Sequence, residues 1–235
     1  MIERLLDSPY LWVSITAGFF VIAAELQKRF PTPLLNPLLF SIVMVIVLLL
    51  ITDIPYETYE SGGRLIAIFV TPATVSLAIK LEKNFIYLKR HYKAILTGIV
   101  LGIVFHTAMI FGFGLLFQFD VEMAATLFPK SITTAIAVGV SESLGGLVSL
   151  TVAVVVFTGI IGSVIAPYIF KLGNITDPVA QGVALGSSSH AMGTSKAIEI
   201  GEVQGAMSGL SIVVTGIVVV VLAPFAEPLI HLVFG

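Results

Sequence analysis

Residues 128–146, FPKSITTAIAVGVSESLGG, place a lysine and several hydroxyl side chains inside a strongly apolar chain. Pro129 lacks a backbone N–H and predicts a break in the helix at this point. The helix that resumes after such a break exposes unpaired N–H groups and a partial positive charge. Lys130 adds an ammonium group, and Ser131, Thr133 and Thr134 add hydroxyls. These residues together predict a binding site for an anion.

A second stretch, GSSSHAMGTS at residues 186–195, offers similar chemistry around His190. Asn36 opens an apolar stretch elsewhere, where its side chain either caps that helix or faces the same cavity. The candidate substrate-binding residues are Lys130, Ser131, Thr133, Thr134, Ser188, Ser189, His190, Gly193, Thr194 and Asn36.

Simpler roles exist for each of these side chains. A lysine at a helix end can extend its ammonium to the membrane surface. A buried histidine can be satisfied by a nearby hydroxyl, and hydroxyls can bond to the backbone or to a neighbouring helix. Lys130 lies far from both charged loops, however, and ionisable groups within membrane segments are functional more often than not.

The composition requires a lipid environment for the elements that carry these residues. The chain has 235 residues, of which 57% are hydrophobic and 11% charged, and its mean hydropathy is +1.06. Soluble domains contain about 25% charged residues. Continuous apolar runs of about 20 residues predict membrane helices rather than barrel strands. The sequence has no cysteine and predicts no metal, cofactor or nucleic-acid site.

The hydropathy pattern predicts six full spans and two polar, interrupted segments. The spans are residues 9–26, 34–52, 63–80, 94–117, 147–170 and 205–234, and the interrupted segments are 121–142 and 178–200. Five basic residues in the 80–93 loop predict that this loop is cytoplasmic. The opposite loops are acidic, so the N-terminus is expected on the outer side of the membrane.

The C-terminal part of the chain repeats itself. When residues 128–154 are shifted by 60 they match 188–214 without a gap. Matched pairs include Lys130 with His190, Thr134 with Thr194, Glu142 with Glu202, and Gly145 with Gly205. Two weakly similar units that each contain a broken polar segment are typical of secondary transporters. We therefore expect residues 1–93 to form a scaffold, and 94–235 a core with repeats at about 121–171 and 178–235.

The interrupted segments allow two topologies. If both segments cross the membrane, the chain has eight crossings and the repeats are parallel. If both enter and return, the repeats are inverted, and Lys171 falls on the cytoplasmic side as the distribution of basic residues favours. The predicted fold is an all-α polytopic membrane protein with six full helices plus two re-entrant or discontinuous segments, similar to elevator transporters.

Three stretches resemble the LrgB/CidB/YohK family of bacterial membrane proteins. They are LLNPLL, FPKSITTAIAVGVSESLGG and GVALGSSSHAMGTSKAIEIGEVQGAMSGL, and the likeness covers essentially the whole chain. The third stretch resembles the family pattern G-x-x-SHA-x-GT-x-(KR)A closely. The resemblance implies a holin/antiholin-like protein that affects murein hydrolases, or a transporter of small carboxylates. The plastid glycolate/glycerate translocator is similar to a fusion of an LrgA-type and an LrgB-type domain.

The resemblance also implies a smaller LrgA/CidA/YohJ-like membrane protein as partner, and a homo-oligomer is a further possibility. We expect a secondary transporter of pyruvate-, glycolate- or glycerate-like monocarboxylates, with lysis control as the alternative. An intramembrane hydrolase that uses Ser188 or Ser189 with His190 is disfavoured. Adjacent side chains do not easily reach each other, and no third orienting group is evident. We therefore expect no enzymatic activity.

Overall fold

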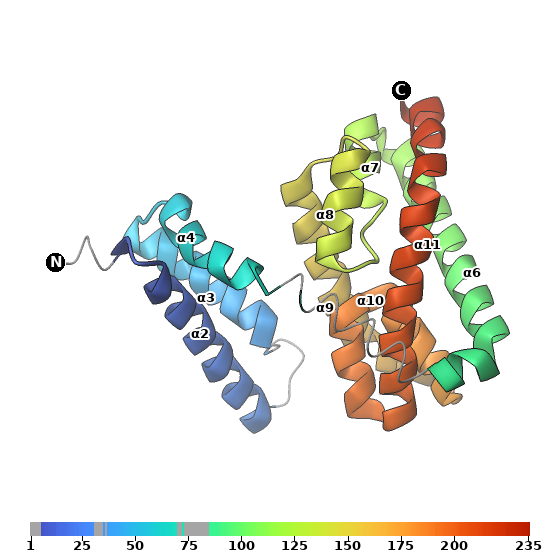
Figure 1. The fold of residues 1–235 in the computed structure, drawn as a ribbon, viewed down its shortest axis with the longest axis horizontal. Coiled ribbons are helices and arrows are strands. Elements are labelled where there is room, and N and C mark those ends of the chain that lie inside the picture. Colours follow the sequence, from blue (N-terminus) through green and yellow to red (C-terminus); the bar gives the residue numbers. More distant parts are fainter. Residues whose placement is uncertain (1–5, 31–34, 36, 70–71, 73–84) are drawn as a thin grey trace. The chain divides into compact units, whose positions relative to one another are not determined.

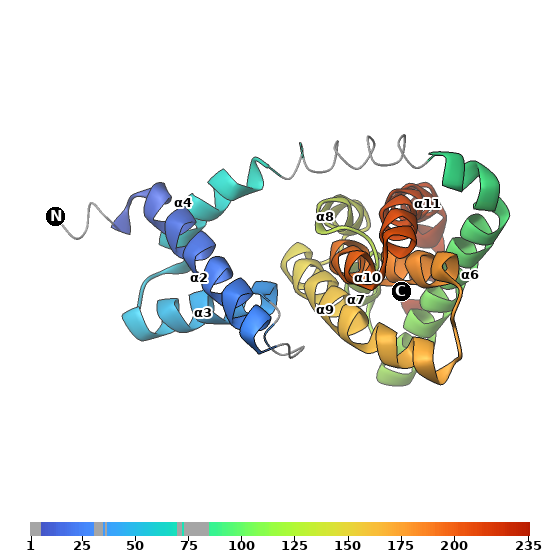
Figure 2. The same ribbon diagram turned by 90° about the horizontal axis from the view of Figure 1, so that it is seen from below.

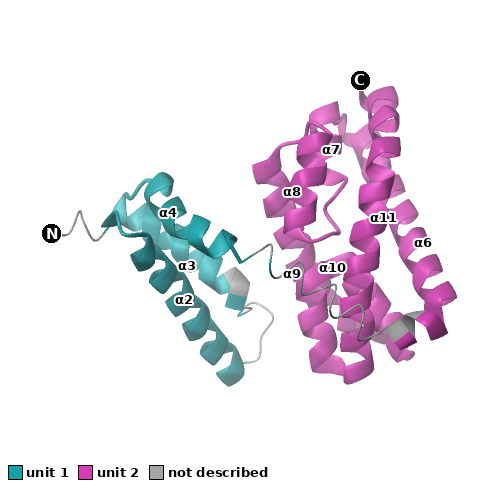
Figure 3. Cartoon of the chain, viewed as in Figure 1, with its two compact units in different colours: residues 1–75 teal, residues 76–235 magenta. Residues whose placement is uncertain are grey.

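A computed structural model describes residues 6–30, 35, 37–69, 72 and 85–235, and the regular structure within these residues is helical. The chain divides into two compact units, residues 1–75 and 76–235, coloured separately in Figure 3. Asn36 and most of the predicted span 63–80 lie outside the described residues.

The first unit contains α2 (Pro9–Arg29), α3 (Pro37–Thr52) and α4 (Tyr56–Ala67). Its core forms around Trp12, which is 1% exposed and packs edge-on against Tyr59 with ring centroids 5.9 Å apart. The Trp12 indole N–H donates to the carbonyl oxygen of Leu6 at 2.8 Å. Gly62 is required beside this ring, because a Cβ there would lie 2.5 Å from the Trp12 Cβ.

The second unit contains the predicted core of the protein. Its helices are α6 (Phe85–Phe117), α7 (Val121–Leu127), α8 (Thr134–Ser143), α9 (Val148–Leu172), α10 (Pro178–Ile200) and α11 (Glu202–Phe234). Apolar side chains from α6, both interrupted segments, α9 and α11 form one buried cluster. Large apolar side chains also cover the outer surface, as at Leu116, which is 70% exposed. Such a surface is suited to lipid rather than to water.

Four of the described helices are long and apolar enough to cross a membrane: α2, α6, α9 and α11. The apolar part of α3, Phe40–Thr52, is shorter than a full span. α11 continues as one helix through Pro224 and Pro228 to Phe234. The helical membrane character agrees with the composition, while the number of crossings stays a prediction.

The chain reverses direction within residues 121–143, which we call the first hairpin. α7 ends at Leu127 and α8 begins at Thr134. Pro129 explains the break, since it cannot donate to the preceding turn. The backbone N–H of Leu147, just after α8, donates to the Thr126 hydroxyl of α7 at 2.8 Å. The chain therefore returns beside its own point of entry, as Figure 1 shows.

α10 reverses in the same way at His190, and residues 178–200 form the second hairpin. The residue has φ 40° and ψ −128°, which lies outside the helical region. Beyond this turn, Gly193 packs directly against the carbonyl oxygen of Leu185 in the first arm. Both arms contact the same part of α11. Gln204 donates to Gln181 of the first arm at 3.0 Å, and Gly205 lies against Ile198 of the second.

The two hairpins open toward opposite ends of the second unit. The second hairpin opens at Gln204, near the start of α11. The first hairpin follows the end of α6, where Phe111 packs against Phe234 at the end of α11 with ring centroids 5.2 Å apart. A 33-residue helix separates these ends by about 50 Å. Figure 2, viewed from below, shows α9 beside α10 and α6 along the outer side.

Candidate functional site

A central cavity of about 540 Å³ lies where the tips of the two hairpins come together. Residues 128–132 at the tip of the first hairpin and Ser187, Ser188 and Ser189 at the tip of the second line this cavity. α6, α9 and α11 supply the remaining wall. Non-helical backbone at membrane depth is tolerated only when it is buried in protein or lines a polar cavity, and both tips satisfy that condition.

Lys130 supplies the positive charge of the central cavity. Its side chain forms no hydrogen bond or ion pair with any described residue, and all three described ion pairs involve other residues. Its charge acts electrostatically on the neighbouring His106 of α6. Ser131 also lines the cavity, and its hydroxyl likewise forms no hydrogen bond with any described residue. An unpaired ammonium group with an adjacent hydroxyl is suited to an anionic ligand.

The serines of the second hairpin face the central cavity from the other side. Ser187 and Ser188 donate to the carbonyl oxygens of Val183 and Ala184, at 2.8 and 2.7 Å. The hydroxyl oxygens of Ser188 and Ser189 lie 3.1 Å apart. Ser189 packs directly against Gly162 of α9, where an added Cβ would overlap the serine hydroxyl. A glycine on α9 is therefore needed to seat this tip.

Three predicted residues of the second hairpin make packing contacts away from the cavity wall. Nε2 of His190 lies 2.9 Å from the carbonyl oxygen of Val155 on α9, and the ring is 5% exposed. The Thr194 hydroxyl lies 2.8 Å from the Ser208 hydroxyl of α11. Gly193 permits the close approach of the two arms. Direct roles for these residues as ligands stay predictions.

The remaining predicted residues either do not line the central cavity or lie outside the residues that the structure describes. Thr133 and Thr134 form the start of α8, and neither lines the cavity. The Thr133 hydroxyl is buried without a hydrogen-bond partner among the described residues. Asn36 is outside the described residues, so its role stays a prediction.

Three polar cavity residues on the long helices were not among the predicted site residues: His106 of α6, Thr158 of α9 and Thr215 of α11. The His106 Nε2 and the Thr215 hydroxyl are buried without a hydrogen-bond partner in the described part of the chain. Each is a polar residue in a long and largely apolar helix. Such residues are more often packing groups than ligands, and only the folded arrangement brings these three together.

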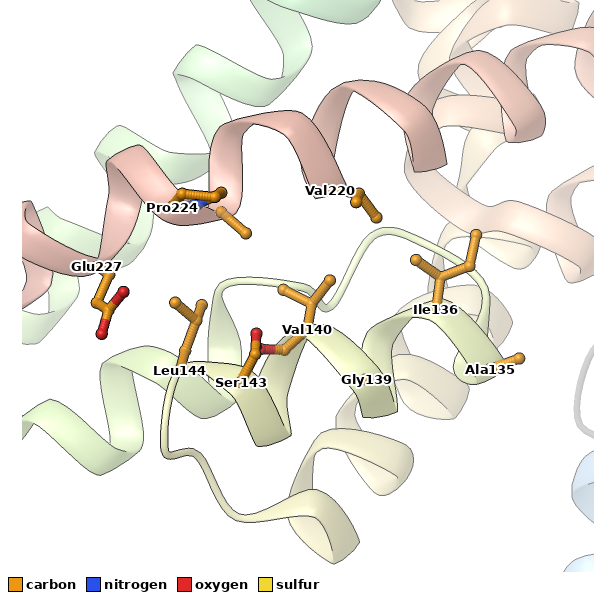
Figure 4. Close-up of a pocket in the computed structure, with 10 residues that line it drawn as sticks. Ala135, Ile136, Gly139, Val140, Ser143, Leu144, Val220, Pro224 and Glu227 are labelled. Carbon is orange, nitrogen blue, oxygen red and sulfur yellow. The ribbon is translucent and has the colours of Figure 1, made fainter.

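A second pocket on the same unit has different chemistry. It is a groove of about 440 Å³ between α8 and α11, shown in Figure 4. Its lining is mostly apolar, with Glu227 and Ser143 as the polar side chains, and it includes no basic residue. The first unit has an apolar pocket of about 550 Å³ between α2, α3 and α4. Neither pocket offers the positive charge that an anion requires.

The central cavity can therefore bind a small anion by charge and hydrogen bonds. Its described lining includes a lysine, a histidine and several hydroxyls, and no carboxylate. Within the described residues no group of three or more His, Cys, Asp or Glu side chains could hold a metal ion. The His190 ring is directed to the Val155 carbonyl oxygen rather than to a serine.

Comparison with known proteins agrees with the sequence motifs. No solved structure matches this chain. The family model described as the LrgB-like family matches residues 16–229, which include α3, both hairpins and nearly all of α11. This match covers most of the sequence and confirms the resemblance drawn from its motifs, so the chain belongs to the LrgB-like family of membrane proteins.

Proposed function

We propose that this protein is a secondary transporter of small monocarboxylates that carry a 2-oxo or 2-hydroxy group. The observation that carries the proposal is the unpaired Lys130 in a cavity whose described lining contains no acidic residue. A carboxylate placed beside this ammonium group would gain a charge-assisted hydrogen bond, worth about 1.5–3 kcal/mol. The hydroxyls of Ser131, Ser188 and Ser189 would complete its hydrogen bonding.

The arrangement of the hairpins supports transport rather than a fixed pore. Two broken segments whose tips line one cavity, and which open toward opposite ends of the unit, are suited to alternating access, in which each hairpin opens the site to one side. In this proposal the core moves as an elevator, residues 1–93 form the scaffold, and the two repeats are inverted. A smaller LrgA-type membrane protein would assist in a bacterial plasma membrane, with the N-terminus of this chain outside.

Counterflow in proteoliposomes tests the proposal. Labelled pyruvate, glycolate and glycerate would be offered to vesicles that contain the purified protein, alone and with an LrgA-type partner. Lys130→Met should lower the apparent affinity by about ten- to a hundredfold, because it removes one charge-assisted hydrogen bond. Lys171→Met is the matched control, since this lysine is exposed at the end of α9.

The outcomes separate the two functions that the family membership leaves open. Uptake that requires Lys130 but not Lys171 would support transport, and the two preparations would reveal whether the partner is obligatory. Absence of uptake by folded protein in both preparations would reject the transporter. It would favour control of murein hydrolases and lysis instead.

A further inference from the structure

Thr215 has an unusual environment for a hydroxyl in the middle of a helix. The residue is 1% exposed, and its hydroxyl has no hydrogen-bond partner among the residues that the structure describes. Serine and threonine within helices commonly donate to the carbonyl one turn earlier. Ser211, one turn before Thr215, does so and donates to the Met207 carbonyl oxygen at 2.8 Å. A buried hydroxyl without a partner destabilises the fold, so Thr215 calls for an explanation.

The position of Thr215 provides that explanation. It lines the central cavity from α11, together with Thr158 of α9 and His106 of α6. The Thr158 hydroxyl forms no hydrogen bond with any described residue, and the His106 Nε2 is buried without a partner among them. The cavity thus has a charged part at Lys130 and Ser131 and a neutral polar part on three long helices.

A ligand with a carboxylate alone would satisfy only one of these two parts. Its two oxygens would pair with Lys130 and the hydroxyls beside it, and would leave the neutral groups of the long helices unpaired. An acid with an additional hydroxyl or oxo oxygen could satisfy both parts. A site built around a substrate hydroxyl discriminates strongly against the analogue that lacks it, because buried polar groups then remain unpaired.

Building on the transport function proposed above, we propose that Thr215 is a specificity-determining residue. Its hydroxyl forms a hydrogen bond with the hydroxyl or oxo oxygen of the substrate. It thereby selects substituted acids over unsubstituted acids of the same length. Lys130 holds the carboxylate, which all these acids share, so affinity for the charge and selectivity for the second oxygen reside in different residues.

Competition in the counterflow assay tests this assignment with pairs of acids that differ by one hydroxyl: glycolate with acetate, and lactate with propionate. The variant is Thr215→Val, which keeps the shape of the side chain and removes the hydroxyl. We expect glycolate and lactate to compete about tenfold less well, as for the loss of one neutral hydrogen bond, and acetate and propionate to be unchanged. Thr215→Ser should restore most of the selectivity.

Thermal stability in detergent without any acid provides a second readout. Because the Thr215 hydroxyl is unpaired in the described chain, Thr215→Val should melt at the same temperature as the wild type or higher. If the Thr215 hydroxyl had a structural partner, its removal would instead lower the melting temperature. Ser211→Ala is the matched control, since its hydroxyl bonds to its own helix and does not line the cavity. It should lower stability slightly and leave the selectivity intact.

Each result decides the assignment. A lower melting temperature for Thr215→Val, or an unchanged ratio of glycolate to acetate competition, would overturn it, as would a wild type that does not distinguish the two acids. Failure of the transport function itself is recognised separately. In that case the wild-type protein would take up none of the acids, and no comparison with Thr215→Val would be needed to see it.

Discussion

Nε2 of His190 lies 2.9 Å from the carbonyl oxygen of Val155, and this contact joins the turn of the second hairpin to α9. A carbonyl can only accept, so the ring nitrogen donates. The contact holds His190 at a φ of 40°, a backbone conformation that residues other than glycine rarely adopt. The hydrogen bond and the burial of the ring offset the strain of this backbone.

Replacement of His190 should separate the effect of the hydrogen bond from the effect of the backbone strain. His190→Ala and His190→Gly both remove the hydrogen bond, but glycine adopts a positive φ without strain. We expect both variants to be less stable than the wild type, and alanine to be less stable than glycine by about 1–2 kcal/mol. Size-exclusion chromatography after graded heating in detergent measures the difference. Equal stability of the two variants would show that the backbone strain does not contribute.

Glycines at the hairpins should respond to an added methyl group according to what surrounds them. Gly193→Ala places a Cβ against the Leu185 carbonyl, which is backbone and cannot rotate away. The cost should reach about 3 kcal/mol, at the upper end for overpacking. Gly139→Ala in α8 is the control, because nothing lies within 4 Å of the new Cβ.

Gly139→Ala should be neutral or stabilising by up to about 1 kcal/mol, because alanine favours a helix more than glycine does. The same heating assay measures both variants. A Gly193→Ala protein as stable as Gly139→Ala would mean that the two arms of α10 are not held together as described.

The break in the first hairpin could be predicted from the sequence because its cause is local. Pro129 removes a backbone donor and favours a break, and Lys130 and the hydroxyls beside it are polar enough to mark the interruption. The break at His190 has no such signal at the residue itself. Its positive φ depends on a contact with Val155, which is 35 residues away in the sequence.

The candidate site likewise contains residues that the sequence predicts and residues that it does not. Lys130, Ser131, Ser188 and Ser189 lie in clusters that the sequence marks as polar, and all four line the cavity. Thr158 and Thr215 are isolated in Val/Ile-rich helices, where a lone threonine predicts nothing. The internal repeat gives no help with Thr215, since the shift of 60 residues places it opposite Val155.

A network of buried hydroxyls holds the open end of the first hairpin against α9. The hydroxyls of Ser141 and Thr151 lie 2.7 Å apart, and Thr151 also donates to the Thr126 carbonyl oxygen at 3.1 Å. Thr151→Val leaves both partners unsatisfied in a buried setting. We expect a loss of about 1–3 kcal/mol in unfolding free energy.

A double-mutant cycle tests whether this loss arises from the network. Ser141→Ala combined with Thr151→Val should cost less than the sum of the single variants, because each single variant leaves a polar partner unpaired. Stabilities that add within error would indicate that the two hydroxyls do not interact.

Cysteine accessibility can decide whether the hairpins re-enter the membrane or cross it. The sequence contains no cysteine, so single substitutions need no altered background. Glu122 and Ser143 are exposed near the two ends of the first hairpin, and Thr176 and Glu202 near the two ends of the second. The Leu147–Thr126 hydrogen bond brings the ends of the first hairpin together, and contacts at Gln204 and Gly205 do so for the second.

We therefore expect a membrane-impermeant maleimide to label Glu122→Cys and Ser143→Cys from one side, and Thr176→Cys and Glu202→Cys from the other. The basic residues of the 80–93 loop predict that the first pair is outside and the second cytoplasmic. Right-side-out and inverted vesicles distinguish the two sides. Labelling of Glu122→Cys and Ser143→Cys from opposite sides would reject re-entry. It would also remove the basis for inverted repeats, because two hairpins that cross fully would make the repeats parallel.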